Sequence, residues 1–562
     1  MKTLVAALMI SLCSTVAAQQ FPSLPGQGRS MVVTKLGIVA APQFLASQAG
    51  AHILEVGGNA VDAAIAANAV MGVVQPYVNG MGGDLFVLYY DAKTGKLYGL
   101  NSSGWTPKGL TIEYLKSHGV DHINPIGVET IDVPGAVAGW DALRGRFGNL
   151  PFSEILAPAI YYAQNGFPLA ERNARYWVAK SLMQQPGYKE TYLPNGIAPK
   201  VGDEFKNPAL ANSLRQVAEH GRDAFYNGPM TETIVKFLQA QGGTHTLEDF
   251  REFQPEWVEP ISTTYRGWTV YELPPNGQGI AALTMLNIME QFPLGQYAHN
   301  SAEALHIMIE AKKLAYADMY KYVGDPRFTP VPVKEMLSTN LAKRRAALIK
   351  MDKAACEVVP SDIEKMLGAH GNSTIYLSAI DKDGNIVSLI QSNYAGYGTG
   401  MVAPGLGFSF QNRGAGFQLT PDLPNSLAGR NRPLHTIIPA FMEKGDIRIG
   451  FGIMGGWNQA QAHAQFVANV VDYGMNVQAA LEQPRFTKGT FEGCDVQMEN
   501  TIPQSVREEL TKRGHQIELL EPFSFTVGQG EAVVRDTKRN VNFAGADPRS
   551  DGEAIPQEPA TK

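Results

Sequence analysis

The chain has 562 residues, of which 44% are hydrophobic and 18% are charged, and this composition excludes an intrinsically disordered protein. The formal net charge is −6 and the sequence has no basic stripe, so nucleic acid is not expected as a partner. The length exceeds what one small core needs, and we therefore expect two domains or one large domain with several layers.

The N-terminal segment has the pattern of an export signal. Lys2 precedes an apolar run from Leu4 to Leu12, which is too short to span a bilayer. Small residues at positions 16–18 match a cleavage site, so we expect a signal peptide over residues 1–18 and a mature chain that begins at Gln19. The alternative is an uncleaved buried helix. No later stretch is long and apolar enough for a membrane helix, and we expect an exported protein, periplasmic or extracellular, without a membrane partner.

Three cysteines are present, and one of them, Cys13, leaves with the predicted signal peptide. The two that remain have no spacing typical of a zinc site. A Cys356–Cys494 disulfide is permitted in an oxidising compartment. Two unpaired, partly buried thiols fit the sequence equally well, so the state of these cysteines stays open.

Turns, strands and helices alternate along the chain. The predicted elements, in chain order, are a glycine turn at residues 57–59, a small-residue helix from about Ala60 to Val70, a strand hairpin over residues 84–100, a helix within residues 301–322 capped at Asn300 or Ser301, and a helix from Gln459 to Tyr473. This mixture indicates a layered α/β or α+β protein and excludes a helical bundle or a β-barrel.

The stretch "GNSTIYLSAIDKDGNIVS", residues 371–388, predicts a β-hairpin. Residues 374–380 are mostly β-branched, aromatic or aliphatic, as a strand requires, and Asp383-Gly384 is a hairpin-turn signal. The acids of "DKDGN" do not form a calcium loop, because the glycine is out of register and the closing glutamate is missing. The open question is the role of Thr374 at the head of the first strand.

A threonine hydroxyl becomes a useful nucleophile when a base lies beside it, and one such base is the threonine's own α-amino group. That amine has a reference pKa of about 7.7–8.0, so much of it is neutral near working pH. It exists only after the bond between Ser373 and Thr374 has been cut. A threonine is also an ordinary residue at the start of a strand, so this stretch alone does not decide its role.

Seven sequence blocks favour the catalytic role. They are "GGNAVDAAIAA" (57–67), "GMGGD" (80–84), "DVPGAVAGW" (132–140), "ELPPNGQGIAALTMLNIME" (272–290), "DKDGNIVS" (381–388), "GFGIMGGWNQ" (450–459) and "ADPRSDGEA" (546–554). Together they resemble the γ-glutamyltransferase (glutathione hydrolase) family of N-terminal-nucleophile hydrolases, over about Gly37 to Ala554. The resemblance implies an α+β fold, the αββα four-layer sandwich, formed jointly by two autoproteolytic fragments, residues 19–373 and 374–562.

The resemblance also implies the catalytic residues. Thr374 is the nucleophile, and its α-amine serves as the base after cleavage between Ser373 and Thr374. Gly455 and Gly456 match a glycine pair whose backbone N–H groups stabilise the oxyanion. Ser392 matches a hydroxyl residue that bonds the nucleophile. No metal or organic cofactor is implied, and the expected partners are a small γ-glutamyl or acyl-amide substrate and the chain's own two fragments as a heterodimer.

The positions that bind the substrate in this family differ here. The arginine for the donor α-carboxylate aligns with Ser103, and the aspartate for the α-ammonium aligns with Gly416. Paired serines align with His435-Thr436, a glutamine aligns with Arg413, and an asparagine aligns with Tyr394, next to Asn393. The nearby Trp105 and Trp457 favour an apolar pocket, and the lid loop between Pro424 and Arg432 is short. A desolvated amino-acid head needs countercharges, so these changes put the donor in question.

Three functions follow from this comparison. The first is a γ-glutamyltransferase or glutathione hydrolase that binds its donor through Ser103, Asn393, Arg413, His435 and Thr436. The second is an exported acylase or amidase with the same mechanism, whose acyl group lacks the α-amino group and ends in a carboxylate bound by Arg413 or His435. The third is a non-catalytic binding protein, which the retained Thr374 argues against.

Overall fold

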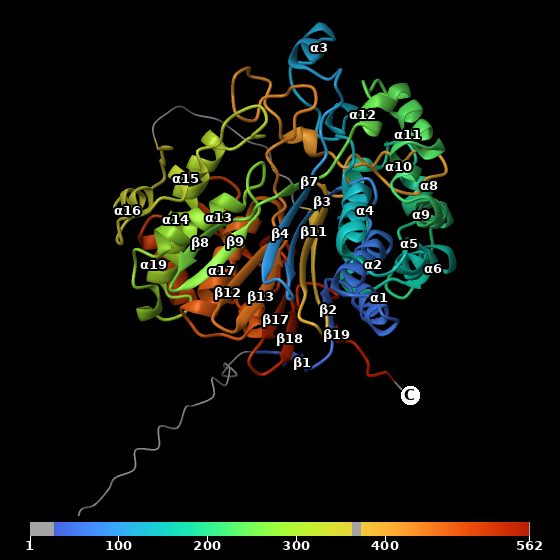
Figure 1. Ribbon diagram of the computed structural model, residues 1–562. Helices are drawn as coiled ribbons and strands as arrows, with labels where there is room; N and C mark the ends of the chain where they lie inside the picture. The colour runs from blue at the N-terminus through green and yellow to red at the C-terminus, as the bar shows by residue number, and fades with distance from the viewer. Residues whose placement is uncertain (1–26, 362–372, 561–562) are drawn as a thin grey trace, which may run out of the picture.

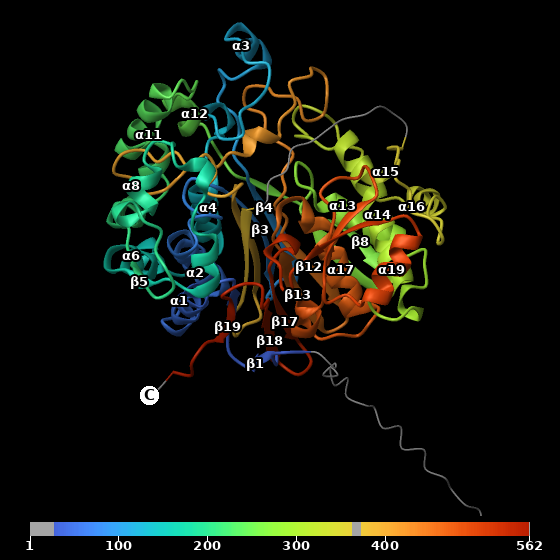
Figure 2. The same cartoon turned by 180° about the vertical axis from the view of Figure 1, so that it is seen from behind.

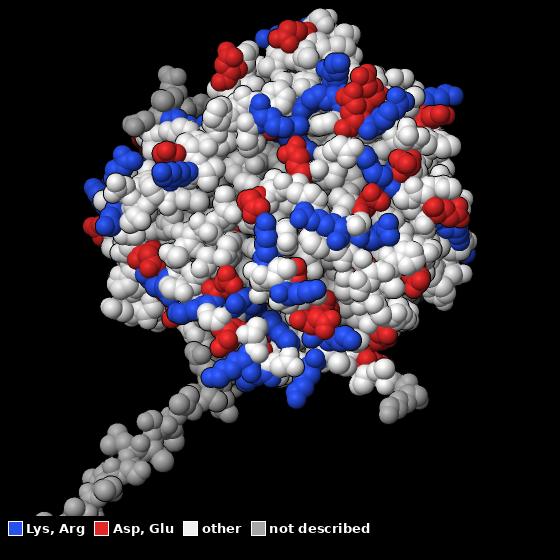
Figure 3. Space-filling model, in the orientation of Figure 1, with Lys and Arg blue, Asp and Glu red and all other residues white. Residues whose placement is uncertain are grey.

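A computed structural model describes residues 27–361 and 373–560, with Ser373 described by its backbone alone. The predicted signal peptide, including Cys13, lies outside these residues, as do residues 362–372 ahead of the predicted cleavage site. In the described part of the chain, no helix is long and apolar enough to cross a membrane. On the face shown in Figure 3, lysines and arginines are interspersed with aspartates and glutamates.

Two antiparallel sheets form the centre of the structure (Figure 1). Sheet I contains, in spatial order, β19 (Glu553–Pro556), β2 (Ile38–Ala41), β10 (Ser373–Ile380), β11 (Ile386–Tyr394), β3 (Asp84–Asp91), β4 (Lys96–Ser102) and β7 (Glu256–Val258). Sheet II contains β1 (Val32–Thr34), β18 (Val541–Ala546), β17 (Gly530–Asp536), β13 (Ile447–Ile453), β12 (Ala440–Lys444), β9 (Trp268–Glu272) and β8 (Ile261–Tyr265). The two sheets pack face to face through a shared core that includes Phe86 and Tyr376 from sheet I and Phe441 and Val533 from sheet II.

Helices cover the outer face of each sheet (Figures 1 and 2). Sheet I is covered by α1 (Phe44–Glu55), α2 (Ala60–Val74), α4 (Ala136–Phe147), α5 (Phe152–Ile155), α6 (Ala157–Asn165), α9 (Pro208–His220), α10 (Asp223–Tyr226), α11 (Pro229–Ala240) and α12 (Leu247–Arg251). Sheet II is covered by α13 (Gly279–Met289), α14 (Ala302–Tyr322), α15 (Val333–Met336), α16 (Thr339–Ala346), α17 (Gln459–Val471), α18 (Val477–Glu482) and α19 (Gln504–Lys512). The predicted α+β fold, an αββα four-layer sandwich, is confirmed.

Shorter elements decorate this sandwich. They are α3 (Ile112–Ser117), α7 (Glu171–Tyr176), α8 (Tyr188–Tyr192), the pair β5 (Phe167–Pro168) and β6 (Glu204–Phe205), and a small sheet of β14 (Phe486–Thr487), β15 (Asp495–Glu499) and β16 (Gln516–Leu520). Helix α3 projects from one end of the molecule in both ribbon views (Figures 1 and 2).

The predicted local elements are present, with small differences at their ends. The helix predicted from Ala60 to Val70 continues to Val74, and Asn59 caps its N-terminus. Of the two caps predicted for α14, Ser301 is the one that accepts a backbone hydrogen bond. The predicted hairpin forms β10 and β11, with Gly384 at φ 91° in the connecting turn.

The structure decides between the two predicted states of the cysteines. Cys356 and Cys494 form a disulfide, with the sulfur atoms 1.97 Å apart. Cys356 follows α16, and Cys494 directly precedes β15. The alternative of two unpaired thiols is therefore wrong for this structure.

Candidate active site

Thr374 lies at the head of β10, in the centre of sheet I, and its side chain is fully buried. Its hydroxyl donates a hydrogen bond to Ser392 Oγ in the neighbouring strand β11, over 3.2 Å. The Gln459 amide donates to Thr374 Oγ1 over 3.4 Å. Gln459 is the first residue of α17, which follows β13 of sheet II, so Thr374 faces sheet II. The sandwich thereby holds this hydroxyl between its two sheets.

Ser392 is the centre of the hydrogen-bond network around Thr374. Besides the Thr374 hydroxyl, its Oγ accepts the backbone N–H of Tyr394 over 2.8 Å and the Arg413 Nη2 group over 2.9 Å. Ser392 is itself fully buried. Two fixed donors therefore orient Ser392 Oγ, and its position in turn orients Thr374.

Gly455 and Gly456 form the turn between β13 and α17. Their φ angles are 134° and 60°, both in the region that favours glycine. A Cβ added at Gly455 would lie 3.2 Å from Asn458 Nδ2 and 3.3 Å from Gly528 Cα, so a side chain would crowd this turn. The turn ends three residues before Gln459, which contacts Thr374. The family resemblance implies that this turn is the oxyanion site, and the turn lies close to Thr374 through Gln459.

Arg413 connects Ser392 to a second buried cluster. Its Nη1 donates to Thr436 Oγ1 over 2.6 Å, and its Nε donates to Asp84 Oδ2 over 3.4 Å. The same Asp84 oxygen accepts a hydrogen bond from His435 Nε2 over 3.1 Å. Arg413, Thr436, Asp84 and His435 are all buried. Three of the predicted substrate-binding residues, Arg413, His435 and Thr436, therefore lie together beside the hydrogen-bond network of Thr374.

Burial sets the protonation states in this cluster. Burial first, and then the positive charge of Arg413, lower the pKa of His435 to about 4, so His435 is neutral at neutral pH and donates to Asp84. Burial, and then the negative charge of Asp84, raise the pKa of Asp132 well above its usual range. Arg413 and Asp84 form an ion pair within this cluster, with Nε and Oδ2 3.4 Å apart.

The other two predicted substrate-binding residues differ in position. Ser103 donates to Asn101 Oδ1 over 2.8 Å and accepts from Asn276 Nδ2 over 3.3 Å. The Asn276 carbonyl accepts the His435 N–H over 2.8 Å, so Ser103 lies next to the cluster of Asp84 and His435. Asn393 follows Ser392 in β11, and successive strand residues point to opposite faces. Its amide donates to the Pro76 carbonyl over 3.5 Å, away from the Thr374 network.

Aromatic side chains line the positions where the related family carries polar groups. The Arg413 guanidinium lies 4.6 Å from the centre of the Tyr394 ring, and Tyr394 has a left-handed backbone with φ 78°. A Cβ added at Gly416 would lie 3.9 Å from the Tyr394 hydroxyl. Trp457, which follows the glycine turn, packs against Tyr320 with ring centres 5.1 Å apart. Trp105, by contrast, packs on Phe253 and under Arg430, as its ring contacts show.

Two residues of the site were not singled out from the sequence. Asp84 closes the block "GMGGD", and Gln459 closes the block "GFGIMGGWNQ", so both lay inside segments that carried the family pattern. Two signals were available: an acid at the first position of a predicted strand, and an amide at the first position of a helix that follows a glycine turn. Their partners in space could not be read from those signals.

A separate buried cluster has metal-ligand composition. His306 and Glu310 lie one turn apart on α14, and ligand atoms of His306, Glu310 and His515 lie within 4.8 Å of one another. The two imidazoles hydrogen-bond each other over 2.8 Å, and the Lys313 ammonium pairs with Glu310 over 2.5 Å. These interactions engage His306 Nδ1, His515 Nε2 and the Glu310 carboxylate, and they stand apart from the Thr374 contacts.

Comparison with known proteins gives matches over nearly the whole chain. The sequence profile of a family described as gamma-glutamyltranspeptidase matches residues 46–557. The glutathione hydrolase-like YwrD proenzyme of Bacillus subtilis (strain 168) is 36% identical over 534 residues, which are 94% of this chain and 99% of the relative. The oxamate amidohydrolase proenzyme of Klebsiella pneumoniae is 33% identical, over 93% of this chain and 98% of the relative. The crystal structure of cephalosporin acylase from Bacillus halodurans superposes with a TM-score of 0.87 at 40% identity, covering 97% of this chain and 100% of that structure.

Proposed function

The chain belongs to the gamma-glutamyltranspeptidase family and is an enzyme of the N-terminal-nucleophile hydrolase or transferase type, and on this premise we propose that Thr374 is its nucleophile. The observation that carries the proposal is the hydrogen bond from Thr374 to Ser392 at the head of β10, inside the sandwich. The predicted non-catalytic binding protein is disfavoured, because the nucleophile, its hydroxyl partner and the glycine turn are all retained in one corner of the fold.

The first step in this proposal is self-cleavage. Thr374 Oγ attacks the carbonyl carbon of Ser373, and the peptide bond is replaced by an ester between these two residues. Water then hydrolyses the ester, which leaves a carboxylate on Ser373 and a free α-amine on Thr374. The two products are residues 19–373 and 374–562 if the signal peptide is removed as predicted, and they stay together as a heterodimer.

The second step is turnover of an acyl amide. The free amine of Thr374 accepts the proton from its own Oγ, which attacks the donor carbonyl, and the same proton passes to the leaving amine. Backbone N–H groups of Gly455 and Gly456 hold the oxyanion, and each such donor is worth about 2.7–4 kcal/mol in related sites. The Gln459 amide donates to Thr374 Oγ1 and so favours its anionic form. Water, or an acceptor amine in the transferase case, resolves the acyl-enzyme.

We infer that the donor acyl group lacks an α-ammonium group, which is the acylase function. Gly416 contributes no carboxylate where the related family places one, and the Tyr394 hydroxyl faces that position. All three guanidinium nitrogens of Arg413 already donate to Asp84, Thr436 and Ser392. The likeness to a cephalosporin acylase over 97% of the chain supports the same choice.

A γ-glutamyl donor is the second candidate, and one observation favours it. The buried Asp84–Arg413 pair offers one carboxylate and one guanidinium beside the nucleophile network. An α-amino-acid head carries the complementary two charges and would have to separate this pair to bind it. The glutathione hydrolase-like relative, 36% identical, supports this reading.

Intact mass and paired substrates test both parts of the proposal. Wild-type protein is expected to give two pieces that meet between Ser373 and Thr374, whereas Thr374→Ala is expected to stay one uncut chain. The control is Ser378→Ala, which removes a buried hydroxyl on the same strand and is expected to give two pieces. An uncut wild-type enzyme with full activity would refute the mechanism. Glutaryl-p-nitroanilide is expected to react faster than γ-glutamyl-p-nitroanilide, and the reverse order supports the second candidate.

We also propose that the protein is exported, on the pattern of residues 1–18 and on the presence of a disulfide. Cell fractionation with a tagged chain checks this, and recovery of the uncut precursor in the cytoplasm alone contradicts it.

A further inference from the structure

We propose that the Cys356–Cys494 disulfide is a covalent cross-link between the two fragments of the processed enzyme. The inference rests on the proposed cleavage between Ser373 and Thr374, because that bond lies between the two cysteines in the sequence. The cysteines are 138 residues apart. Before cleavage, the disulfide closes a loop within one chain, and after cleavage it joins two chains.

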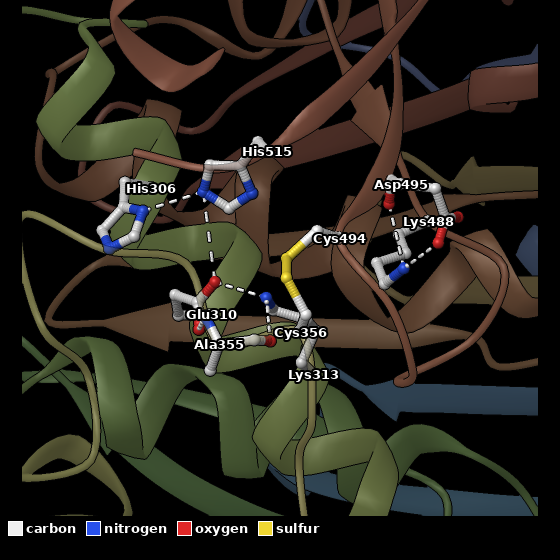
Figure 4. Close-up of a disulfide and its surroundings, with 9 residues drawn as sticks. All are labelled: His306, Glu310, Lys313, Ala355, Cys356, Lys488, Cys494, Asp495 and His515. Carbon is white, nitrogen blue, oxygen red and sulfur yellow. Dashed lines mark hydrogen bonds and ion pairs between the residues drawn. A yellow bond between two sulfur atoms is a disulfide. The ribbon is translucent and has the colours of Figure 1, made fainter. Parts of the chain in front are cut away.

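Hydrogen bonds hold the two cysteine-bearing segments in place, and Figure 4 shows the disulfide with its surroundings. The N–H of Gly493, the residue before Cys494, donates to the Cys356 carbonyl over 2.9 Å. The N–H of Ala355 donates to Glu310 Oε2 over 3.2 Å, and Lys313 Nζ donates to the Ala355 carbonyl over 2.8 Å. The segment that carries Cys356 is therefore fixed both on α14 and on the segment that carries Cys494. These contacts hold the two cysteines close together independently of the disulfide.

The Cys494 side is held from the same helix. Lys312 Nζ donates to the Thr490 carbonyl over 2.6 Å, and Lys488 pairs with Asp495 over 2.8 Å. Cys494 is 3% exposed, whereas Cys356 lies at the surface. A reductant therefore reaches the disulfide from the Cys356 side, while the packing of the Cys494 side keeps the two segments in place.

The fragments are also interleaved without the disulfide. In sheet I, β10 and β11 of the small fragment lie between β2 and β3 of the large fragment. In the folded state this pairing already holds the fragments together. The cross-link matters when the sandwich opens, because it makes re-pairing of the fragments intramolecular and independent of protein concentration.

The chemistry of the cross-link balances with a disulfide oxidant of the exported compartment. The two thiols lose two protons and two electrons, and the oxidant's own disulfide is reduced to two thiols by exchange. Hydrolysis of the Ser373–Thr374 bond adds one water and involves no cysteine. The two covalent events are therefore independent, and each can be blocked without the other.

Denaturing gels with and without reductant test the proposal, on protein exported by cells and quenched with N-ethylmaleimide. Without reductant the wild type is expected as one band, and with reductant as two. The double variant Cys356→Ser/Cys494→Ser is expected as two bands in both conditions. A tryptic digest without reductant is expected to contain residues 354–365 joined to residues 489–507.

Each of the other possible outcomes would overturn a specific part of the proposal. Two bands without reductant, with both cysteines carrying maleimide, overturn the cross-link and leave the proposed cleavage intact. One band with reductant overturns the cleavage, and the cross-link between fragments falls with it. The uncut Thr374→Ala chain is the matched control, because it carries the linked peptide but gives one band in either condition.

A dilution series tests the consequence of the cross-link. After a brief heat pulse, the recovered activity per molecule of wild type is expected to be unchanged over about a hundredfold dilution, and that of the double variant to fall with dilution. Equal recovery of the two proteins at every concentration overturns the role assigned to the cross-link.

Discussion

Replacement of Ser392 by alanine is the sharpest test of how the site holds its nucleophile. Ser392 Oγ accepts from the Thr374 hydroxyl, from the Tyr394 N–H and from Arg413 Nη2, at 3.2, 2.8 and 2.9 Å. The substitution removes one oxygen atom and so affects three donors at once. We expect both the free energy of unfolding and kcat to fall, for separate reasons.

The magnitudes follow from these contacts. Loss of the oxygen leaves the Tyr394 N–H and one Arg413 N–H without this acceptor in a buried site, and each such donor costs about 1–3 kcal/mol. After partial relaxation, the free energy of unfolding is expected to fall by roughly 2–4 kcal/mol. Thr374 loses the acceptor that orients it, which is worth about 1–2 kcal/mol and corresponds to a roughly 5- to 30-fold lower kcat.

Urea unfolding and steady-state kinetics measure the two effects, with kcat counted per cleaved molecule because self-cleavage also slows. Ser388→Ala is the matched control, since Ser388 lies on the same face of β11 and its hydroxyl bonds Tyr376 over 2.9 Å. It is expected to lose stability but keep kcat. If the Ser392 variant turns over within about threefold of wild type, or the Ser388 variant loses as much activity, the proposed support of Thr374 is wrong.

Three further predictions concern the cluster beside the nucleophile. Arg413→Gln is expected to lower kcat roughly tenfold with little change in the donor KM, because Arg413 acts through Ser392. A change in KM alone would show instead that Arg413 binds the donor. Gly416→Asp adds a carboxylate for an α-ammonium group and is expected to raise the ratio of γ-glutamyl to glutaryl kcat/KM roughly five- to tenfold. The neutral control Gly416→Asn is expected to leave this ratio unchanged. Equal ratios in the two variants would contradict a role for the charge. Burial lowers the pKa of His435 from 6.5 to about 4. As the pH falls, the unfolded chain therefore takes up a proton at His435 before the folded chain does. The free energy of unfolding is expected to fall between about pH 6.5 and pH 4, by up to about 1.4 kcal/mol per pH unit. Urea unfolding of His435→Gln is expected to show a shallower fall in this window, and a slope equal to that of wild type would exclude His435 as a cause.

Much of the fold could be predicted because it depends on short-range patterns. The hairpin that carries Thr374 follows from β-branched residues on either side of Asp383-Gly384, and its turn forms at Gly384. The small-residue helix α2 follows from its alanines and its Asn59 cap. The four-layer arrangement followed only from the family resemblance, and the order of strands within each sheet was not predicted, because no local pattern encodes which strands become neighbours.

The contacts of the site were harder to predict because they join distant parts of the chain. Arg413 meets Asp84 across 329 residues, and Gln459 meets Thr374 across 85 residues. An arginine in a loop is usually predicted to face solvent, where it is available to bind a substrate carboxylate. In the structure its charge is already balanced by Asp84, so its expected role changes from binding the donor to positioning Ser392.

Under the proposed function, Arg413 also explains how a change of donor can coexist with an unchanged reaction. The nucleophile side of the site keeps Thr374, Ser392 and the glycine turn, and the differences from the family pattern lie on the donor side. Arg413 touches both sides, since Nη2 donates to Ser392 and Nη1 donates to Thr436. The guanidinium thereby holds the Ser392 hydroxyl and places on the donor side a positive charge that pairs with Asp84. The donor side and the support of Thr374 are therefore linked through one residue, and variants at Arg413 are expected to lose rate even where the donor KM is unchanged.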